Sequence, residues 1–436
     1  MDKRLTALYL LITVLLLVQS FSHIFIDEGE FVATGYYMAS GEIPHKDFVQ
    51  FHNMFYFVFY LPFFLLSKGP FIHILIRLIS AIFTMICAYM VFSISKKNRL
   101  GNPHISALIF LVGYTGMPIS FLRNEYFAMV TLLAFFYFEN QMIKGFVLAL
   151  FGASSIMAII PAGLLFGYLI LSRQKNNSSS YIKGALLATL FFCIFMAFTS
   201  FDRLYNNLFE LSVMLGPQIT RPWHEVVFFS VFFAAPYLFF GGINLIKNWK
   251  KNISKEVVLL LIGIFGSILV VSLISNGIVK AKLPSYLPAI AILAPYCTKL
   301  SKKILVAIGL LTILVYTPSF NGIMYIKNQY QLNNCIKNDT IVQKINDNAF
   351  IIFRERNSYY WYNLKNFAQG NMSLNLREIP NPITLCGYSM EKTDFICSSS
   401  KYNELFAYCN SAPPKNMIYL IRDFVFRITK IKLSIV

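Results

Sequence analysis

The chain has 436 residues, of which 56% are hydrophobic, 16% aromatic and only 13% charged. A soluble domain carries roughly 25% charged residues, so this composition excludes an ordinary cytosolic enzyme, a nucleic-acid-binding module and a disordered protein. The formal net charge is +18, from 38 basic against 20 acidic residues. In a chain with many apolar runs, such an excess is typical of membrane-facing loops. We therefore interpret the chain as a polytopic α-helical membrane protein.

Apolar runs recur along most of the chain. They lie at 5–20, 54–67, 71–94, 105–120, 126–140, 146–160, 162–172, 184–201, 226–246, 257–275, 286–297 and 304–326. Because so many runs follow the first one, we interpret 5–20 as an uncleaved first span with a cytoplasmic amino end rather than a signal peptide. A full crossing needs ~20 residues. The short runs at 54–67, 162–172 and 286–297 are therefore expected to be tilted, re-entrant or interfacial.

Six basic clusters predict the orientation of the spans, since Lys and Arg gather in cytoplasmic loops. The clusters are Lys3-Arg4, Lys96 to Arg99, Lys144, Arg173 to Lys183, Lys247 to Lys255, and Lys299 to Lys303. All of them face the cytoplasm if the 54–67 run does not cross but lies as a helix on the outer side. This arrangement gives about eleven spans of membrane-crossing length. It places 21–70, 121–125, 202–225, 276–285 and the tail outside, and it makes the polar 176–180 stretch a cytoplasmic linker.

The tail differs in composition from the rest of the chain. We predict two domains, a membrane domain over 1–326 that includes the outer loop 21–70, and a small periplasmic α/β domain over 327–436 with strands near 350–353 and 417–421. Four cysteines fall in the tail, at Cys335, Cys386, Cys397 and Cys409. An even set favours disulfides in an oxidising compartment, in any of three pairings, over free thiols. Cys87, Cys193 and Cys297 lie in apolar runs, where a thiol is usually a small buried hydrophobe.

The first outer loop carries adjacent acids, Asp27 and Glu28, directly after the first span. Carboxylates near lipid are costly and tend to be functional, and one of them can deprotonate an acceptor hydroxyl as a general base. The residues that follow have helical spacing, and Gly41 to Pro44 would end that helix. The alternative is structural, because Asp27 ahead of Glu30 also fits a capping box.

A second outer stretch offers two cations and a phenol. Between the runs at 257–275 and 286–297 lie Lys280 and Lys282, with Tyr286 at the start of the second run. Together they could bind a lipid-linked phosphate. The alternative is interfacial anchoring, since Tyr and Lys are enriched at membrane boundaries.

The two segments together resemble GT-C membrane glycosyltransferases. Asp27-Glu28, followed by Gly41-Glu42-Ile43-Pro44-His45-Lys46-Asp47-Phe48 and then His52, resembles the first periplasmic loop of that superfamily. Lys282-Leu283-Pro284-Ser285-Tyr286 resembles the Lys-Leu-Pro-Thr-Tyr segment of the lipid A aminoarabinose transferases, and protein O-mannosyltransferases share the broader plan. The resemblance implies inverting transfer of a sugar from a polyprenyl-phosphate donor. It makes Asp27 the base, Glu28 its support, and Lys282 and Tyr286 contacts of the donor phosphate, with Lys280 beside them.

Relatives carry a further outer-loop acid after the third crossing, and Arg123-Asn124-Glu125 is the nearest match here. The match implies Glu125 as an acceptor or metal contact and Arg123 as a phosphate ligand, while the alternative is a mutual ion pair at a helix end. Candidate cavity residues are His52, Asp47 and His224. The alternative for His52 is that it packs as an ordinary amphipathic side chain, and for Asp47 that it is a solvated loop charge. The alternative for His224 is interfacial anchoring together with its neighbour Trp223. No His/Asp spacing commits the chain to a metal, and a divalent cation stays open because some relatives need one.

The expected function is that of a multi-pass enzyme of the bacterial inner membrane. Size and layout resemble the serotype-converting O-antigen glucosyltransferases, which implies an undecaprenyl-phosphate glucose donor and a sugar hydroxyl of the O-antigen repeat of lipopolysaccharide as acceptor. A donor synthase and a flippase would be partners, and nucleic acid would not. Transfer to lipid A or protein is the enzymatic alternative. The competing classes are a lipid-linked sugar flippase, which usually has repeats and mid-membrane charges, and a non-catalytic assembly subunit.

Overall fold

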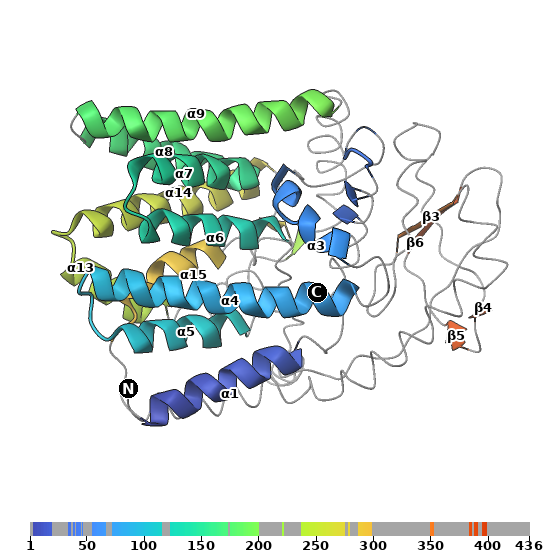
Figure 1. Ribbon diagram of the computed structural model, residues 1–436, viewed down its shortest axis with the longest axis horizontal. Coiled ribbons are helices and arrows are strands. Elements are labelled where there is room, and N and C mark those ends of the chain that lie inside the picture. Colours follow the sequence, from blue (N-terminus) through green and yellow to red (C-terminus); the bar gives the residue numbers. More distant parts are fainter. Residues whose placement is uncertain are drawn as a thin grey trace.

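The computed structural model describes a largely helical protein (Figure 1). The described residues are 3–19, 34–35, 38–39, 41–44, 46, 55–66, 72–115, 123–172, 175–199, 220–221, 237–274, 278–279, 287–298, 349–352, 383–385, 388–390 and 395–398. The long helices are α1 (Lys3–Gln19), α4 (Ile72–Lys97), α5 (Pro103–Thr115), α6 (Asn124–Tyr137), α7 (Gln141–Ser154), α8 (Ile156–Ser172), α9 (Lys175–Phe198) and α14 (Asn252–Ile274). The short ones are η1 (Phe55–Phe59), α3 (Leu61–Leu66), the π-helix η4 (Tyr237–Gly241), α13 (Gly242–Lys247), α15 (Leu287–Leu293) and η7 (Ala294–Tyr296).

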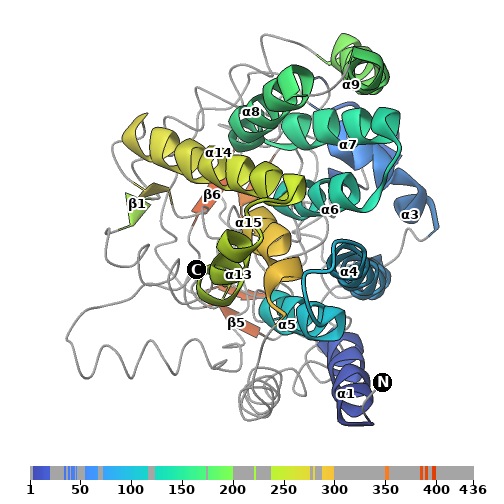
Figure 2. The ribbon, with the colours of Figure 1, turned by 90° about the vertical axis from the view of Figure 1, so that its left-hand side faces the viewer.

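The described helices form one bundle with the largely buried α6 at its centre. Helix α4 packs against α5 and α6, α6 packs against α7 and α15, and α7 packs against α8 and α9. Figure 2 shows α1 and α9 on opposite sides of the bundle, with α14 crossing obliquely to reach α8. Figure 1 shows α1, α4 and α9 lying along the long axis of the molecule.

Among the residues that the structure describes, two helices are long and apolar enough to cross a membrane, Leu75–Lys97 and Ser178–Phe198. Two further apolar helices, Gln141–Ser154 and Met157–Ser172, are shorter. Large apolar side chains are exposed on the outer helices, for example Leu10 on α1, Tyr89 on α4 and Leu186 on α9. Apolar surface of this extent is rare on soluble monomers, and it fits a helical membrane protein.

Glycines set the closest helix crossing, that of α7 with α9. A Cβ placed on Gly184 would overlap the carbonyl oxygen of Met142, and one placed on Gly145 would overlap that of Tyr181. Small residues allow helix backbones to approach in this way in membrane proteins, where van der Waals packing drives association. At the α8–α14 crossing, Gly263 likewise lies against Pro161.

Three expectations from the sequence were wrong in detail. The stretch 176–180, expected to be a linker, forms the first turns of α9. The break between the runs at 146–160 and 162–172 falls at Ser155 instead, and Pro161 lies inside α8. Cys87 and Cys297 are buried, but Cys193 is exposed on the outer helix α9.

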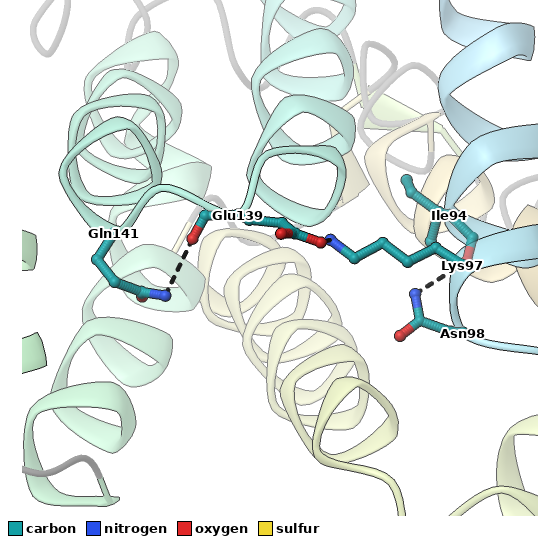
Figure 3. A network of polar contacts seen from close by, with 5 residues as sticks. All are labelled: Ile94, Lys97, Asn98, Glu139 and Gln141. Carbon is teal, nitrogen blue, oxygen red and sulfur yellow. Dashed lines mark hydrogen bonds and ion pairs between the residues drawn. The ribbon is translucent and has the colours of Figure 1, made fainter.

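One end of the bundle is rich in basic residues, and we call it the basic end. There the C-terminal turn of α4 meets the turn between α6 and α7, where Lys97 Nζ lies 2.7 Å from Glu139 Oε1 (Figure 3). The hydrogen bond from Lys97 lowers the pKa of the Glu139 carboxyl. At the start of α5, burial lowers the pKa of His104, and the charge of Lys96 adds to the effect.

The strands within the described ranges form three separate antiparallel pairs. β1 (Thr220–Arg221) pairs with β2 (Ile278–Val279), β3 (Ala349–Ile352) with β6 (Phe395–Ser398), and β4 (Ile383–Leu385) with β5 (Tyr388–Met390). β3 covers most of the strand predicted at 350–353, whereas the one predicted at 417–421 lies outside the described residues, as do Cys335, Cys386 and Cys409. Cys397 is opposite Phe350 in the β3–β6 register.

Candidate functional site

Two residues of the predicted site, Arg123 and Glu125, are among the described residues, and both lie at the amino end of α6. Because α6 ends beside Lys97 and Glu139, its beginning lies at the opposite end of the bundle from the basic turns. We call this the site end. The other predicted site residues lie outside the described residues: Asp27, Glu28, Asp47, His52, His224, Lys280, Lys282 and Tyr286.

Arg123 and Glu125 form a largely buried ion pair. Arg123 Nε donates to Glu125 Oε2 at 3.2 Å, and the two side chains are only 7% and 12% exposed. Arg123 precedes the helix with extended backbone, and its carbonyl accepts the first bonds of α6, from the N–H groups of Tyr126 and Phe127. Removing one partner of a buried pair leaves an uncompensated charge and typically costs about 3–5 kcal/mol. The pair is therefore a strong constraint on the start of α6.

Asn124, between the two charged residues, was not singled out from the sequence. It is 8% exposed, and within the described part of the chain its Oδ1 has no hydrogen-bond partner. A buried acceptor without a donor is uncommon and calls for an explanation such as a ligand or water. Here it stands at the amino end of a helix, where the backbone dipole favours negative charge. A buried guanidinium, a helix amino end and an unsatisfied carbonyl together suit a ligand with both phosphate oxygens and hydroxyls.

The next turn of α6 is fixed to α4. The hydroxyls of Tyr126 and Thr84 lie 3.3 Å apart, and Thr84 Oγ1 also donates to the carbonyl of Ser80 at 2.8 Å. Both side chains are fully buried. Because this polar contact is enclosed by apolar packing, it holds α6 in one register against α4 and with it the position of Arg123.

An aromatic cluster lies beside the amino end of α6. It joins η1, α6 and α9 through Phe55, Tyr56, Phe59, Tyr60, Phe127, Phe191, Phe192 and Phe195. Tyr56 stacks on Phe127 with ring centroids 5.5 Å apart, and Phe55 meets Phe192 edge to face at 5.2 Å. Aromatic pairs of this kind add about 0.5–1.5 kcal/mol each beyond their buried area. The cluster places the 54–67 run at the site end as two short helices.

Part of the predicted first outer loop packs next to the aromatic cluster. Gly35 lies directly against the ring of Phe64 on α3, so closely that a Cβ at position 35 would overlap it. Phe64 in turn stacks on Phe57 of η1, with centroids 6.2 Å apart. After Met38 the chain turns, with Gly41 donating its N–H to the Met38 carbonyl at 3.0 Å and adopting φ +91°, which glycine accepts readily. Contacts therefore run from the loop through α3 and η1 to α6.

Two other predicted outer loops meet through the β1–β2 pair. Arg221 is opposite Ile278, and Thr220 is opposite Val279. His224 follows β1 by three residues and Lys280 follows β2 directly in the sequence. The pairing thus brings together the backbones of two segments that the sequence separates by more than fifty residues.

Within the described ranges, no three His, Cys, Asp or Glu side chains gather closely enough to hold a metal ion. Comparisons of the chain with protein-family models, with curated proteins and with solved structures find no match.

Proposed function

We propose that the protein is a GT-C-like inverting glycosyltransferase that moves a sugar from an undecaprenyl-phosphate donor to a hydroxyl of the O-antigen repeat at the periplasmic face. The observation that supports this most is the buried Arg123–Glu125 pair with Asn124 between them, at the end of the bundle away from the basic turns. It joins a fixed cation and an unsatisfied acceptor in the neighbourhood of the first outer loop, as a phosphosugar site requires.

In this proposal the acceptor hydroxyl oxygen attacks the anomeric carbon of the donor sugar. The bond from that carbon to the phosphate oxygen breaks, and the hydroxyl proton passes to Asp27, with Glu28 supporting the loop. Undecaprenyl phosphate leaves with the bonding electron pair. Its developing negative charge calls for nearby cations rather than a proton donor, a role we assign to Arg123, Lys280 and Lys282, with Tyr286 as a hydroxyl donor.

Glu125 has a positioning role. A guanidinium carries five N–H donors in a fixed plane, and the bond to Glu125 uses the one on Nε. Because the Glu125 carboxylate holds Nε, it fixes the orientation of the whole planar guanidinium of Arg123. Asn124 Oδ1 would accept a hydrogen bond from a sugar hydroxyl, which would satisfy it. Phosphate and sugar are thereby bound by consecutive residues at one helix end.

We further propose about eleven spans, a cytoplasmic amino end and a periplasmic tail that forms an α/β domain, in the bacterial inner membrane. The support is that the turns after α4, α6 and α13 all lie at one end. These turns and the helix ends beside them carry Lys96, Lys97, Arg99, Lys144, Lys247, Lys250 and Lys251. Clusters of this kind mark the cytoplasmic side. A synthase and a flippase would supply the donor. His52, Asp47 and His224 remain candidates for the acceptor side.

The test combines mass spectrometry of surface polysaccharide with a double-mutant cycle. A host would carry wild type, Asp27→Asn, Arg123→Met, Glu125→Leu, or the last two together, at matched membrane levels. We expect a one-hexose gain on the repeat with wild type and none with Asp27→Asn. Each single change at the pair should destabilise by about 3–5 kcal/mol, and the double change should recover most of that loss without recovering transfer.

The Lys97–Glu139 pair supplies a matched control, because it is an exposed ion pair at the other end of the bundle. The double variant Lys97→Met/Glu139→Gln should keep transfer near the wild-type level. If Arg123→Met/Glu125→Leu recovers both stability and transfer, the pair is structural only. If wild type adds no hexose, the proposed reaction on O-antigen is wrong.

A further inference from the structure

Two basic turns are held together at the basic end by contacts between residues 153 and 152 positions apart in the sequence. One follows α4 and the other joins α13 to α14. Lys251 Nζ donates to the carbonyls of Asn98 at 2.5 Å and Arg99 at 3.2 Å, and Asn244 Nδ2 donates to that of Leu100 at 3.0 Å. These bonds satisfy carbonyls left open where α4 ends. The cations on the two turns therefore belong to one surface.

This surface has little compensating negative charge. Of the acids that the structure describes, Glu139 and Glu256 lie near it; Glu139 pairs with Lys97 and Glu256 is buried. Lys251 binds backbone carbonyls. Four exposed cations remain, Lys96, Arg99, Lys247 and Lys250, and we call them the basic patch.

Arg99 occupies a backbone position that usually belongs to glycine. The N–H groups of Leu100 and Arg99 donate to the carbonyls of Ser95 and Lys96, at 3.0 and 3.2 Å. These two bonds define a Schellman motif, whose left-handed residue is normally Gly. Arg99 adopts φ +51° there. A side chain other than glycine costs conformational energy in this region, and the guanidinium that it adds stands in the patch.

The same surface carries exposed apolar side chains. Ile246 is 73% exposed and Trp249 is 50% exposed, and they alternate with Lys247 and Lys250 at the end of α13 and on the turn that follows it. Large apolar side chains interleaved with lysines are typical of segments that lie in the headgroup region of a bilayer. The long helix Leu75–Lys97 ends at this surface, so a membrane that it crosses would have its boundary here.

We propose that the basic patch binds the phosphodiester headgroup of an anionic phospholipid, with Trp249 and Ile246 against the upper part of its acyl chains. Arg99 and Lys247 or Lys250, from the two joined turns, would contact phosphate oxygens by charge-assisted hydrogen bonds. Basic pockets between membrane helices recognise lipid headgroups through this chemistry. The proposal rests on membrane insertion and is independent of the proposed sugar transfer.

Trp249 can report on this lipid directly. The chain has three tryptophans, so the full-length Trp223→Phe/Trp361→Phe variant leaves Trp249 as the sole indole. It would be reconstituted in vesicles that mix phosphatidylglycerol with phosphatidylcholine, with bromine on the chains of one lipid or the other. At equal mole fraction, we expect brominated phosphatidylglycerol to quench Trp249 with a severalfold higher apparent association constant.

Neutralising two lysines of the patch then tests its role. Each lysine near an anionic surface is worth about a fivefold change in binding, so Lys247→Gln/Lys250→Gln should lose most of the preference for phosphatidylglycerol. The control Lys46→Gln/Lys183→Gln removes the same charge from exposed positions outside the two joined turns, on the predicted first outer loop and near the amino end of α9. It should keep the preference. Equal quenching by the two lipids, or an equal loss in both variants, would overturn the proposal.

Discussion

Replacing Gly184 by alanine tests the closest helix contact in the bundle. The added Cβ would overlap the Met142 carbonyl oxygen and would lie 2.8 Å from its carbon and 2.9 Å from the Phe146 nitrogen. These are backbone atoms that no side-chain rotation can move. The overlap with that oxygen is so deep that the two helices must separate by about 1.5 Å to restore ordinary contact, which forfeits about half or more of the dispersion energy along the crossing.

The magnitude follows from two opposing effects. Alanine gains about 1 kcal/mol over glycine in a helix, whereas overpacking costs about 1–3 kcal/mol and occasionally more. Because the overlap here is with backbone, we expect a net destabilisation of about 1–2 kcal/mol. Gly167→Ala on α8 is the control, since nothing lies within 4 Å of its added Cβ. That change should be neutral or stabilising by up to about 1 kcal/mol.

The assay is equilibrium unfolding of the purified full-length protein in mixed micelles, followed by circular dichroism, with wild type and the two variants side by side. We expect the free energy of unfolding to fall with Gly184→Ala and to stay the same or rise with Gly167→Ala. If Gly184→Ala and Gly167→Ala change the free energy of unfolding by the same amount, the close packing of α7 against α9 is wrong.

Three further changes test other contacts by the same unfolding assay. Asn244→Leu should destabilise by roughly 1–3 kcal/mol, because it removes the amide that donates to the carbonyls of Leu100 and Tyr296 and to the hydroxyl of Thr298, at 3.0, 2.8 and 2.9 Å; a neutral result would contradict the network at the basic end. Phe55→Ala should cost about 3–5 kcal/mol, because it removes a fully buried ring from the aromatic cluster, whereas the exposed Phe198→Ala should cost little. Wild type should be more stable than Glu139→Gln at pH 7, and the two should converge as the pH falls through the lowered pKa of Glu139, since protonation ends the bond to Lys97; a pH-independent difference would argue against the pair.

Hydropathy located most described helices because long apolar runs and basic ends are local signals. The run at 71–94 corresponds to α4, and the run at 257–275 corresponds to α14. Two predictions, the linker at 176–180 and the break between the runs at 146–160 and 162–172, were wrong because packing with other helices overrides local sequence preference. Asn176 and its polar neighbours read as a linker, yet they extend α9 at the basic end. The runs at 146–160 and 162–172 placed a break at Pro161, yet α8 begins at Ile156, and the hydroxyl of the preceding Ser155 accepts the Met157 N–H at 3.3 Å.

The candidate site was less accessible from sequence. Arg123 and Glu125 are two residues apart, so their ion pair was foreseeable as one of two alternatives, and the structure shows that pair. Asn124 gave no signal, because burial of a polar side chain at a helix end depends on what packs over it. The aromatic cluster depends on Phe55 meeting Phe192, more than 130 residues away. Sequence spacing carries no information on such contacts.

The two ends of the bundle should respond differently to equal losses of stability. At the site end, the loop residue Gly35 rests on Phe64, whose neighbours in η1 reach α9 through Phe55. Moving α9 by Gly184→Ala therefore shifts the base on which a catalytic loop would stand, and misplacement of about 1 Å can cost on the order of a hundredfold in rate. Asn244→Leu loosens turns at the far end instead. When the two variants lose the same free energy of unfolding, the proposed sugar transfer should fall more with Gly184→Ala than with Asn244→Leu. An equal fall in both variants would mean that activity follows global stability alone.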